Sequence, residues 1–292
     1  MSRAAKSAVR AVAPVALAAL ALLAATALAL APTAPRADAE QRSLLLATTT
    51  SVQDSGLLDA VLPAFTEATG IRVRAVAVGT GAALRMGSEG NADVLLTHAP
   101  AAERKLVESG AVDRRVEIMT NHFVLAGPPA DPAGARSAGS ILEALRTIRN
   151  EQAPFVSRAD DSGTHKREVA LFRAAGLDPT ETWPSLTRTG SGMGLSLQVA
   201  GQKGAYILAD IGTFLAFEDR TGLATLSGSE PALRNVYSLL RVSPAKFPNV
   251  HSAEADAFIA HSRRPETRSQ VAEFGKARFD RALFSPIEPD TP

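Results

Sequence analysis

Short apolar segments alternate with segments of helical periodicity from residue 44 to residue 174, and this alternation restricts the fold more than any other feature. The strand-like segments are 44–47, 71–78, 92–96, 123–126 and 155–156. The segments whose apolar residues recur at helical spacing are 57–65, 82–86, 101–108, 141–148 and 166–174. Strands that alternate with helices build a parallel sheet covered on both faces. We therefore expect an α/β fold of mostly parallel sheets flanked by helices.

Two places along the chain look like crossings between structural units. Residues 127–139 concentrate Gly, Pro and Ala, which is typical of a boundary. Residues 236–240 form a second extended apolar segment and offer a return path. We predict two lobes with a ligand cleft between them. The first lobe would contain residues 40–125 and 236–292, and the second would contain residues 126–235.

The amino-terminal segment has the pattern of a secretory signal peptide. The first ten residues contain Arg and Lys but no acid, and Ala11–Ala31 is almost wholly apolar. Ala37-Asp38-Ala39 has the small-x-small pattern of a signal-peptide cleavage site. We expect cleavage after about Ala39 and a periplasmic mature protein, with retention of the segment as a membrane anchor as the alternative. Because the chain contains no cysteine, it has neither a lipid-attached cysteine nor a disulfide.

The charge of the chain gives no indication of nucleic-acid binding. Residues 1–39 hold four basic residues and one acid, so the remainder has 27 Lys and Arg against 29 Asp and Glu. A nucleic-acid-binding protein usually has a clearly basic face. We expect no nucleic-acid partner.

Small and hydroxyl side chains collect where expected strands end and expected helices begin. These junctions are Thr48-Thr49-Thr50-Ser51, Gly79-Thr80-Gly81-Ala82, Asp160-Asp161-Ser162-Gly163-Thr164 and Thr189-Gly190-Ser191-Gly192-Met193-Gly194. Each alone is explained by helix capping. Helix N-termini also offer free N–H groups and partial positive charge to an anion, at the edge of an α/β sheet where ligands bind. Because two junctions lie on each side of 127–139, the pattern favours one anion site shared by both lobes.

Arg158 adds a full positive charge to the third junction. It follows the strand-like pair Phe155-Val156 by two residues and precedes the Ser-Gly-Thr turn. A solvated loop arginine is the alternative interpretation. A guanidinium matches the geometry of an oxyanion and stays charged at every relevant pH, so the position favours anion binding.

Several motifs resemble the tungstate-binding components of bacterial ABC importers, within the type II periplasmic binding-protein superfamily. The matching stretches, within about residues 44–216, are "TTTSVQDSGLL", "VGTGAALRMG", "ADVLLTHAPAAE", "FVLAGPPADPAG", "FVSRADDSGTHKRE", "TGSGMG" and "KGAYILADIGTFL". The resemblance implies a two-lobed fold and a monomer that binds tungstate or molybdate and delivers it to the transmembrane permease subunits, without a cofactor or a metal cation. The anion ligands that it implies are Thr48, Thr49, Thr50, Ser51, Arg158, Ser162, Gly163 and Thr164, with contributions from Thr80, Gly81 and Ser191.

The chemistry of these anions agrees with the residue types. Tungstate and molybdate are dianions at neutral pH, so they accept hydrogen bonds and donate none. A site of N–H groups, hydroxyls and one Arg satisfies them, and its affinity should change little between about pH 6 and 8. Monohydrogen phosphate carries a proton and needs an acceptor carboxylate, for which Asp54, Asp160 and Asp161 are candidates, so a phosphate-binding protein is the alternative.

An enzyme is a more distant alternative. The histidines show neither metal-ligand spacing nor an HExxH motif, and Gly190–Gly194 lacks the pattern of a nucleophile elbow. Gly79-x-Gly81 has Leu84 where a dinucleotide fingerprint has its third glycine. We expect no enzymatic activity, with a secreted hydrolase as the remaining enzyme class. A transcriptional regulator would need a helix-turn-helix in place of the export signal.

Overall fold

The computed structural model describes residues 42–288, so the expected signal peptide lies outside the described residues. The strands are β1 (Ser43–Thr49), β2 (Arg72–Val78), β3 (Val94–Thr97), β4 (Val112–Gly127), β5 (Phe155–Ser157), β6 (Leu186–Arg188), β7 (Tyr206–Asp210), β8 (Ala224–Thr225), β9 (Arg234–Val242) and β10 (Ser285–Pro286). The first helices are α2 (Thr50–Asp54), α3 (Leu57–Thr69), α4 (Thr80–Ser88), α5 (Pro100–Glu108) and α6 (Ile141–Asn150). The later helices are α7 (Gly163–Ala174), α8 (Met193–Lys203), α9 (Ile211–Thr221), α10 (Ser252–Ser262), α11 (Pro265–Glu273) and α12 (Lys276–Phe279). Short 3-10 turns, η1 (Ala135–Ser137) and η2 (Pro231–Leu233), complete the elements.

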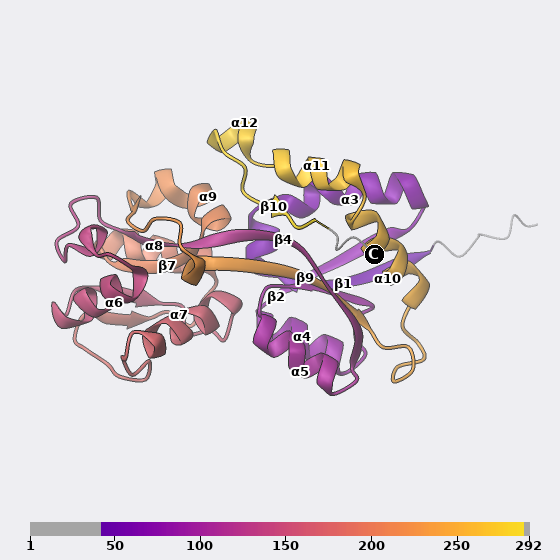
Figure 1. Cartoon of the computed structure of the whole chain (residues 1–292), viewed down its shortest axis with the longest axis horizontal. Coiled ribbons are helices and arrows are strands. Elements are labelled where there is room, and N and C mark those ends of the chain that lie inside the picture. The colour runs from indigo at the N-terminus through magenta and orange to yellow at the C-terminus, as the bar shows by residue number, and fades with distance from the viewer. Residues whose placement is uncertain (1–41, 289–292) are drawn as a thin grey trace, which may run out of the picture. The chain divides into compact units, whose positions relative to one another are not determined.

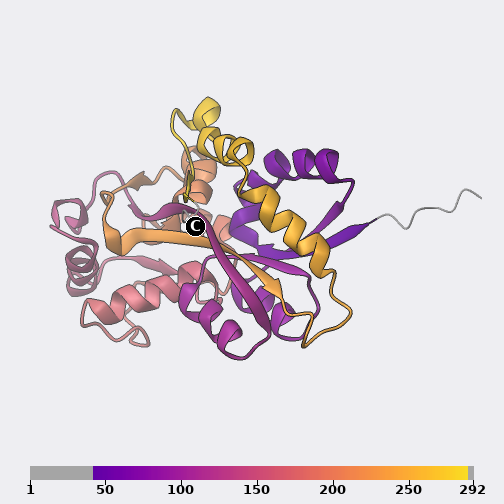
Figure 2. The same cartoon turned by 45° about the vertical axis from the view of Figure 1, so that its right-hand side comes forward.

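Two long strands, β4 and β9, connect the two halves of the sheet. The strand order is β2-β1-β3-β9-β4-β7-β5-β6, with β8 and β10 paired to β4. Both views show β4 and β9 running side by side between the half that carries α4 and α5 and the half that carries α6, α7 and α8 (Figures 1 and 2). The molecule therefore has the two-lobed α/β architecture that the sequence predicts.

The pairing directions follow the same division. β1 pairs with β2 and β3, and β5 pairs with β6 and β7, all in the parallel direction that the alternating pattern predicts. The antiparallel pairs all involve β4 or β9. The sheet is mixed because the chain passes from one half to the other along β4 and returns along β9.

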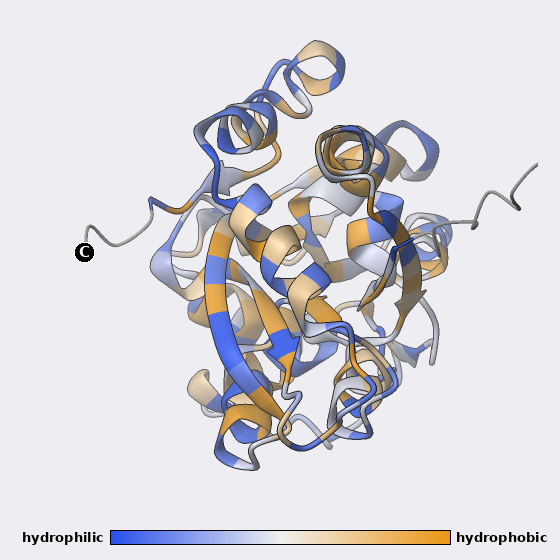
Figure 3. Ribbon diagram, turned by 90° about the vertical axis from the view of Figure 1, so that its right-hand side faces the viewer, coloured by the Kyte–Doolittle hydropathy of each residue, from blue (hydrophilic) through white to orange (hydrophobic). Residues whose placement is uncertain are grey.

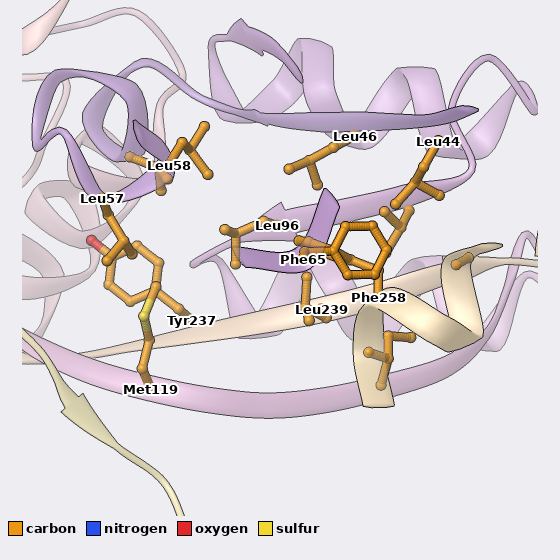
Figure 4. Packing of buried hydrophobic residues seen from close by; sticks show 14 of the residues in the cluster. Leu44, Leu46, Leu57, Leu58, Phe65, Leu96, Met119, Tyr237, Leu239 and Phe258 are labelled. Carbon is orange, nitrogen blue, oxygen red and sulfur yellow. The ribbon is translucent and has the colours of Figure 1, made fainter. Parts of the chain in front are cut away.

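The buried apolar residues form separate clusters in the two halves. One cluster joins β1, α3 and β3 to β9 and α10, and Figure 4 shows Leu46, Phe65 and Phe258 within it. Two other clusters draw all their buried members from residues 123–233. Val271, Phe274 and Phe279 pack against the first cluster, as expected for the carboxy-terminal part of the chain. Each half therefore has a core of its own.

Several boundaries differ from those that the sequence predicts. The strand expected at 123–126 is the end of the much longer β4, and the strand expected at 236–240 extends over Arg234–Val242. Charged residues interrupt the first half of β4, which is mostly only partly buried, so the sequence has no continuous apolar run there. Figure 3 shows hydrophobic and hydrophilic residues interspersed along such strands.

The helices begin earlier than expected at two of the junctions. α4 begins at Thr80 and α7 at Gly163, so their first turns contain the small and hydroxyl residues that the sequence analysis assigns to the turns before them. Among residues 42–288, no helix combines the length and apolar character needed to span a bilayer.

Candidate anion-binding site

The N-terminus of α7 carries the strongest indication of a ligand. Ser162 caps the helix by accepting a hydrogen bond from the His165 amide. Gly163 donates its amide to the Thr80 hydroxyl, 2.7 Å away. Thr164 is wholly buried, and its hydroxyl has no hydrogen-bond partner within the described part of the chain. Buried hydroxyls in native proteins are nearly always paired. Thr164, Thr213 and Ser238 are exceptions among residues 42–288, and Thr164 is the one that follows the Arg158 loop, so it is the candidate to donate to a ligand.

The loop that leads into α7 is held in an unusual conformation. Ala159 and Asp161 have φ angles of 48° and 58°, which lie in the left-handed region that residues other than glycine rarely adopt. Left-handed residues in such a loop turn successive N–H groups toward the same side. The backbone strain concentrates between Arg158 and the helix, as is common at ligand-binding loops.

Arg158 lies in the interior next to this loop, not in solvent. It is 2% exposed, so the interpretation as a solvated loop arginine is wrong. Its Nη2 atom is 2.5 Å from Asp160 Oδ2, and its Nε atom is 3.4 Å from the Ser191 carbonyl oxygen. A buried guanidinium needs compensating negative charge, and Asp160 supplies it here.

Asp160 accepts hydrogen bonds from the groups around it. Its Oδ1 atom accepts from the Ser162 amide at 3.2 Å and from the Ser162 hydroxyl at 2.6 Å, while Oδ2 accepts from Arg158. The carboxylate therefore competes with any external anion for the same donors. Like charges repel, so Asp160 limits the affinity of the site for a dianion.

The hydroxyl residues after β1 have different roles. Thr48 is fully buried, and its hydroxyl donates to the Leu96 carbonyl oxygen of the neighbouring strand β3 at 3.0 Å. Thr49 Oγ1 and Ser51 Oγ are 3.1 Å apart, and both residues are buried. Thr50 is the first residue of α2 and is partly exposed. The Thr48 hydroxyl holds the sheet together, whereas Thr49 and Ser51 lie at its carboxyl edge.

Close packing at α4 brings its N-terminus to the α7 loop. Thr80 accepts the hydrogen bond from Gly163, and both residues are buried. A Cβ atom placed on Gly81 would lie 2.7 Å from Asp161 Oδ2. The Asp161 carboxylate therefore lies directly against the first turn of α4. The second and third junctions of the sequence analysis therefore meet.

The fourth junction contacts the site through its backbone. The Ser191 carbonyl oxygen faces Arg158, while the Ser191 hydroxyl donates to the Thr189 carbonyl oxygen at 3.0 Å. Ser191 thus positions the guanidinium, and its hydroxyl proton has a partner within its own turn.

Asp54, the last residue of α2, interacts electrostatically with Arg158. Partial burial raises the pKa of Asp54 above its ordinary value, and the positive charge of Arg158 opposes that change.

Sequence reasoning missed His98. It follows β3 directly, is 4% exposed, and its Nε2 atom is 3.2 Å from Ser51 Oγ. A Cβ atom on Gly163 would lie 2.7 Å from His98 Cε1, so the imidazole touches the α7 N-terminus as well. The sequence shows no metal-ligand spacing around His98, so that criterion does not identify it. Its place directly after a parallel strand was the available signal, because such positions share one edge of the sheet.

A buried polar network extends from His98 to the two long strands. Asp210 at the end of β7 accepts hydrogen bonds from Asn121 of β4, from Asn235 of β9 and from Tyr237. Asn235 Oδ1 is 3.1 Å from His98 Nδ1. Figure 4 shows the Tyr237 ring in the apolar cluster, with its hydroxyl pointing away from Leu239. The network joins the halves of the sheet beside the site.

A cavity of about 270 Å³ adjoins His98 and Gly163. The basic residues that line it are Arg104, Lys166, Arg167 and Arg234. Such a surface raises the local concentration of anions. Among the described residues 42–288, no cluster of His, Cys, Asp and Glu is arranged to hold a metal cation.

Comparisons with known proteins agree with this description. Residues 32–263 match the model of a PBP superfamily domain. The tungstate-binding protein TupA of Peptoclostridium acidaminophilum is 42% identical over 246 residues, which cover 84% of this chain and 85% of that protein. The structure of the tungstate-binding protein TupA from Desulfovibrio alaskensis G20 superposes with a TM-score of 0.75 at 40% identity, covering 85% of this chain and all of that one. A structure described as the tungstate ABC transporter from Geobacter sulfurreducens gives a TM-score of 0.73 at 39% identity, covering 80% and 98% of the two chains.

Proposed function

Because the chain belongs to the periplasmic binding-protein superfamily and to the family of these tungstate-binding relatives, we propose that it binds tungstate and delivers it to an ABC transporter. Molybdate is nearly the same size as tungstate and is the second ligand that we propose. The protein acts as a binding protein and not as an enzyme.

One observation carries the proposal: a buried arginine and a wholly buried hydroxyl that has no partner among residues 42–288 flank the same helix N-terminus. Arg158 supplies charge, Thr164 supplies a hydrogen-bond donor, and the N-terminus of α7 adds its partial positive charge. This donor-rich set suits a dianion that has no proton to give.

The proposed ligands come from both halves of the sheet. They are Thr49, Thr50, Ser51, Thr80, Gly81, Arg158, Ser162, Gly163 and Thr164. Thr48 contributes by fixing the end of β1 through its bond to Leu96, and Ser191 contributes by positioning Arg158. The contact between Thr80 and Gly163 supports a shared site.

We propose lobe boundaries that follow the separation of the apolar cores. Lobe 1 comprises residues 40–125 and 236–292, and lobe 2 comprises 126–235. The first apolar cluster contains no buried member between residues 120 and 236, which supports this division. β4 and β9 then form the two connections between the lobes, and a bound anion holds the lobes together.

The proposed setting is the periplasm, where the mature protein begins after about Ala39. Its partners are the anion and the transmembrane permease subunits, and it acts as a monomer. The names of the relatives support an oxyanion ligand and an ABC partner.

Calorimetric titration of the mature protein with tungstate, molybdate, sulfate and phosphate tests the proposal. Tungstate should bind at least as tightly as molybdate and more tightly than sulfate. Sulfate should bind weakly because its shorter bonds leave buried donors unpaired. The alternative of a phosphate-binding protein draws on the carboxylate of Asp160 beside Arg158. Tighter binding of phosphate than of tungstate would overturn the proposal and make Asp160 the proton acceptor.

A further inference from the structure

A chain of hydrogen bonds connects a buried carboxylate to the hydroxyl groups at the end of β1. Asp210 lies at one end, and Ser51 lies at the other, 3.2 Å from the imidazole of His98. Asn235 connects the two, with its Nδ2 atom 3.1 Å from Asp210 Oδ2 and its Oδ1 atom 3.1 Å from His98 Nδ1. Every member is at least nine-tenths buried, so water does not compete freely for these bonds.

The carboxylate fixes the direction of the first bonds. Asp210 accepts only, so the atom of Asn235 that faces it must be the amide nitrogen. The opposite orientation would place two acceptors in contact. Asn235 therefore presents its oxygen to His98, and the His98 Nδ1 atom must carry the hydrogen that this bond requires. The imidazole tautomer follows from the position of Asp210.

The tautomer then decides what Ser51 can do. In a neutral imidazole with hydrogen on Nδ1, the Nε2 atom is an acceptor. Ser51 must then donate its hydroxyl proton to His98, and Thr49, 3.1 Å from Ser51, donates to Ser51 in turn. Neither proton is available to an anion. Turning the Ser51 hydroxyl away would leave His98 Nε2 buried without a partner, which is unfavourable.

Protonation of the imidazole reverses the direction of the hydrogen bond between His98 and Ser51. Both ring nitrogens of His98 then donate, so Ser51 accepts from Nε2 and its own proton is free for another acceptor. The imidazolium also adds positive charge beside the N-terminus of α7, where Gly163 touches the ring. A dianion benefits from both changes.

We propose that His98 is a positioning residue that decides whether Ser51 donates to the bound oxyanion, and that anion binding is accompanied by proton uptake on His98. The inference rests on the proposed function, because it needs an oxyanion at the Thr49–Ser51 turn. It replaces the expectation from the sequence that affinity changes little between pH 6 and 8.

The surroundings of His98 agree with a proton that arrives only with the anion. Burial lowers the pKa of His98 below its ordinary value, and the charge of Arg158 lowers it further. Asp210, Glu103 and the hydrogen bond to Asn235 act in the opposite direction. The other charged groups around the ring line the adjoining cavity: Arg104, Lys166, Arg167 and Arg234. The free imidazole is therefore neutral near pH 7.

The sign of the pH effect follows by linkage. A dianion favours the charged imidazole, so binding raises the pKa of His98 from its lowered value. Between the free and the bound pKa values, affinity should rise as the pH falls, by at most about tenfold per pH unit for a single proton. Below the free value, His98 is protonated in both forms and the dependence ends.

Isothermal titration with sodium tungstate tests this inference. At pH 7 and micromolar tungstate, the binding enthalpy is measured in two buffers that differ in ionisation enthalpy. The difference gives the number of protons taken up, which we expect to approach one. His98→Gln keeps a donor for Asn235 and an acceptor for Ser51 but cannot titrate, so its proton uptake should fall to zero. His165→Gln is the matched control, since His165 lies near Asp160 and Asp161 and has a lowered pKa.

The outcomes separate the two proposals. Proton uptake that is lost in His98→Gln and retained in His165→Gln supports the role of His98. Tungstate binding with the same enthalpy in both buffers, or uptake that persists in His98→Gln, overturns it and leaves the proposed function intact. No tungstate binding by the unaltered protein would instead remove the proposed function. If the His98→Gln variant does not fold, nitrogen NMR of the histidine rings in the unaltered protein gives the same information. Nε2 of His98 should gain a proton when tungstate is added. A His98 ring whose protonation does not change would also overturn the inference.

Discussion

Replacement of Thr164 by valine should change stability and affinity in opposite directions. The Thr164 side chain is wholly buried, and its hydroxyl has no partner among residues 42–288. A buried hydroxyl without a partner destabilises the folded protein by about 1–3 kcal/mol. Valine has nearly the same shape and no polar atom, so Thr164→Val should raise the free energy of unfolding of the anion-free protein by about 1–2 kcal/mol.

The same substitution should weaken anion binding. A hydrogen bond from a hydroxyl to a charged acceptor contributes about 1.5–3 kcal/mol. Its loss corresponds to a dissociation constant for tungstate that is roughly 10- to 150-fold larger. Urea unfolding of the anion-free protein gives the first quantity, and calorimetric titration gives the second.

Thr213 provides a matched control. Its hydroxyl is also buried without a partner in the described part of the chain, but it lies in the first turn of α9. Thr213→Val should raise stability to a similar degree and leave tungstate affinity within about twofold, since no hydrogen bond to the anion is removed. Unchanged affinity in Thr164→Val, or an equal loss in both variants, would refute the assignment of Thr164 as a ligand.

Other substitutions test the charges of the site. Arg158→Ala should weaken tungstate binding roughly thirty-fold or more. Arg158→Lys should recover only part of this loss, because lysine lacks the planar guanidinium fork. Equal affinity of both variants and the unaltered protein in calorimetric titration would place Arg158 outside the site. Asp160→Asn removes the carboxylate 2.5 Å from Arg158 Nη2, so tungstate should bind several-fold tighter, and weaker binding in the same titration would mean that Asp160 positions the arginine more than it opposes the anion. Burial raises the pKa of Glu168 to about 8, so the folded protein keeps a proton that the unfolded chain loses, and stability should fall as the pH rises from about 4.5 to 8. Glu168→Gln should therefore raise the melting temperature more at pH 8.5 than at pH 5, and an equal effect at both pH values in thermal melts would contradict this account.

The sequence predicts much of the fold because local patterns determine much of it. The parallel strand–helix units follow from apolar runs and helical spacing, and Ser162 marks the start of α7 because its side chain caps that helix. The first half of β4 could not be predicted in the same way. It contains three consecutive charged residues, 113–115, so it has neither a continuous apolar run nor a strict alternation, and its strand is evident from its pairing with β9.

The network behind the candidate site lies beyond local patterns altogether. His98, Asn121, Asp210 and Asn235 lie in or next to four different strands of the sheet. Asn121 and Asn235 meet because β4 and β9 pair in one particular register, and a shift of one strand by one residue would place the two side chains on opposite faces of the sheet. No short-range signal in the sequence encodes that register.

The place of β9 in the sheet has a consequence for how the chain acquires its structure. β9 lies between β3 and β4, although it is more than a hundred residues from either strand along the chain. β3 therefore gains its second neighbour only after residues 234–242 have joined the sheet. By contrast, β5, β6 and β7 lie within residues 155–210 and can pair through shorter loops. Since long loops close slowly, amides of β3 should become protected from hydrogen exchange after those of β5 and β7 during refolding.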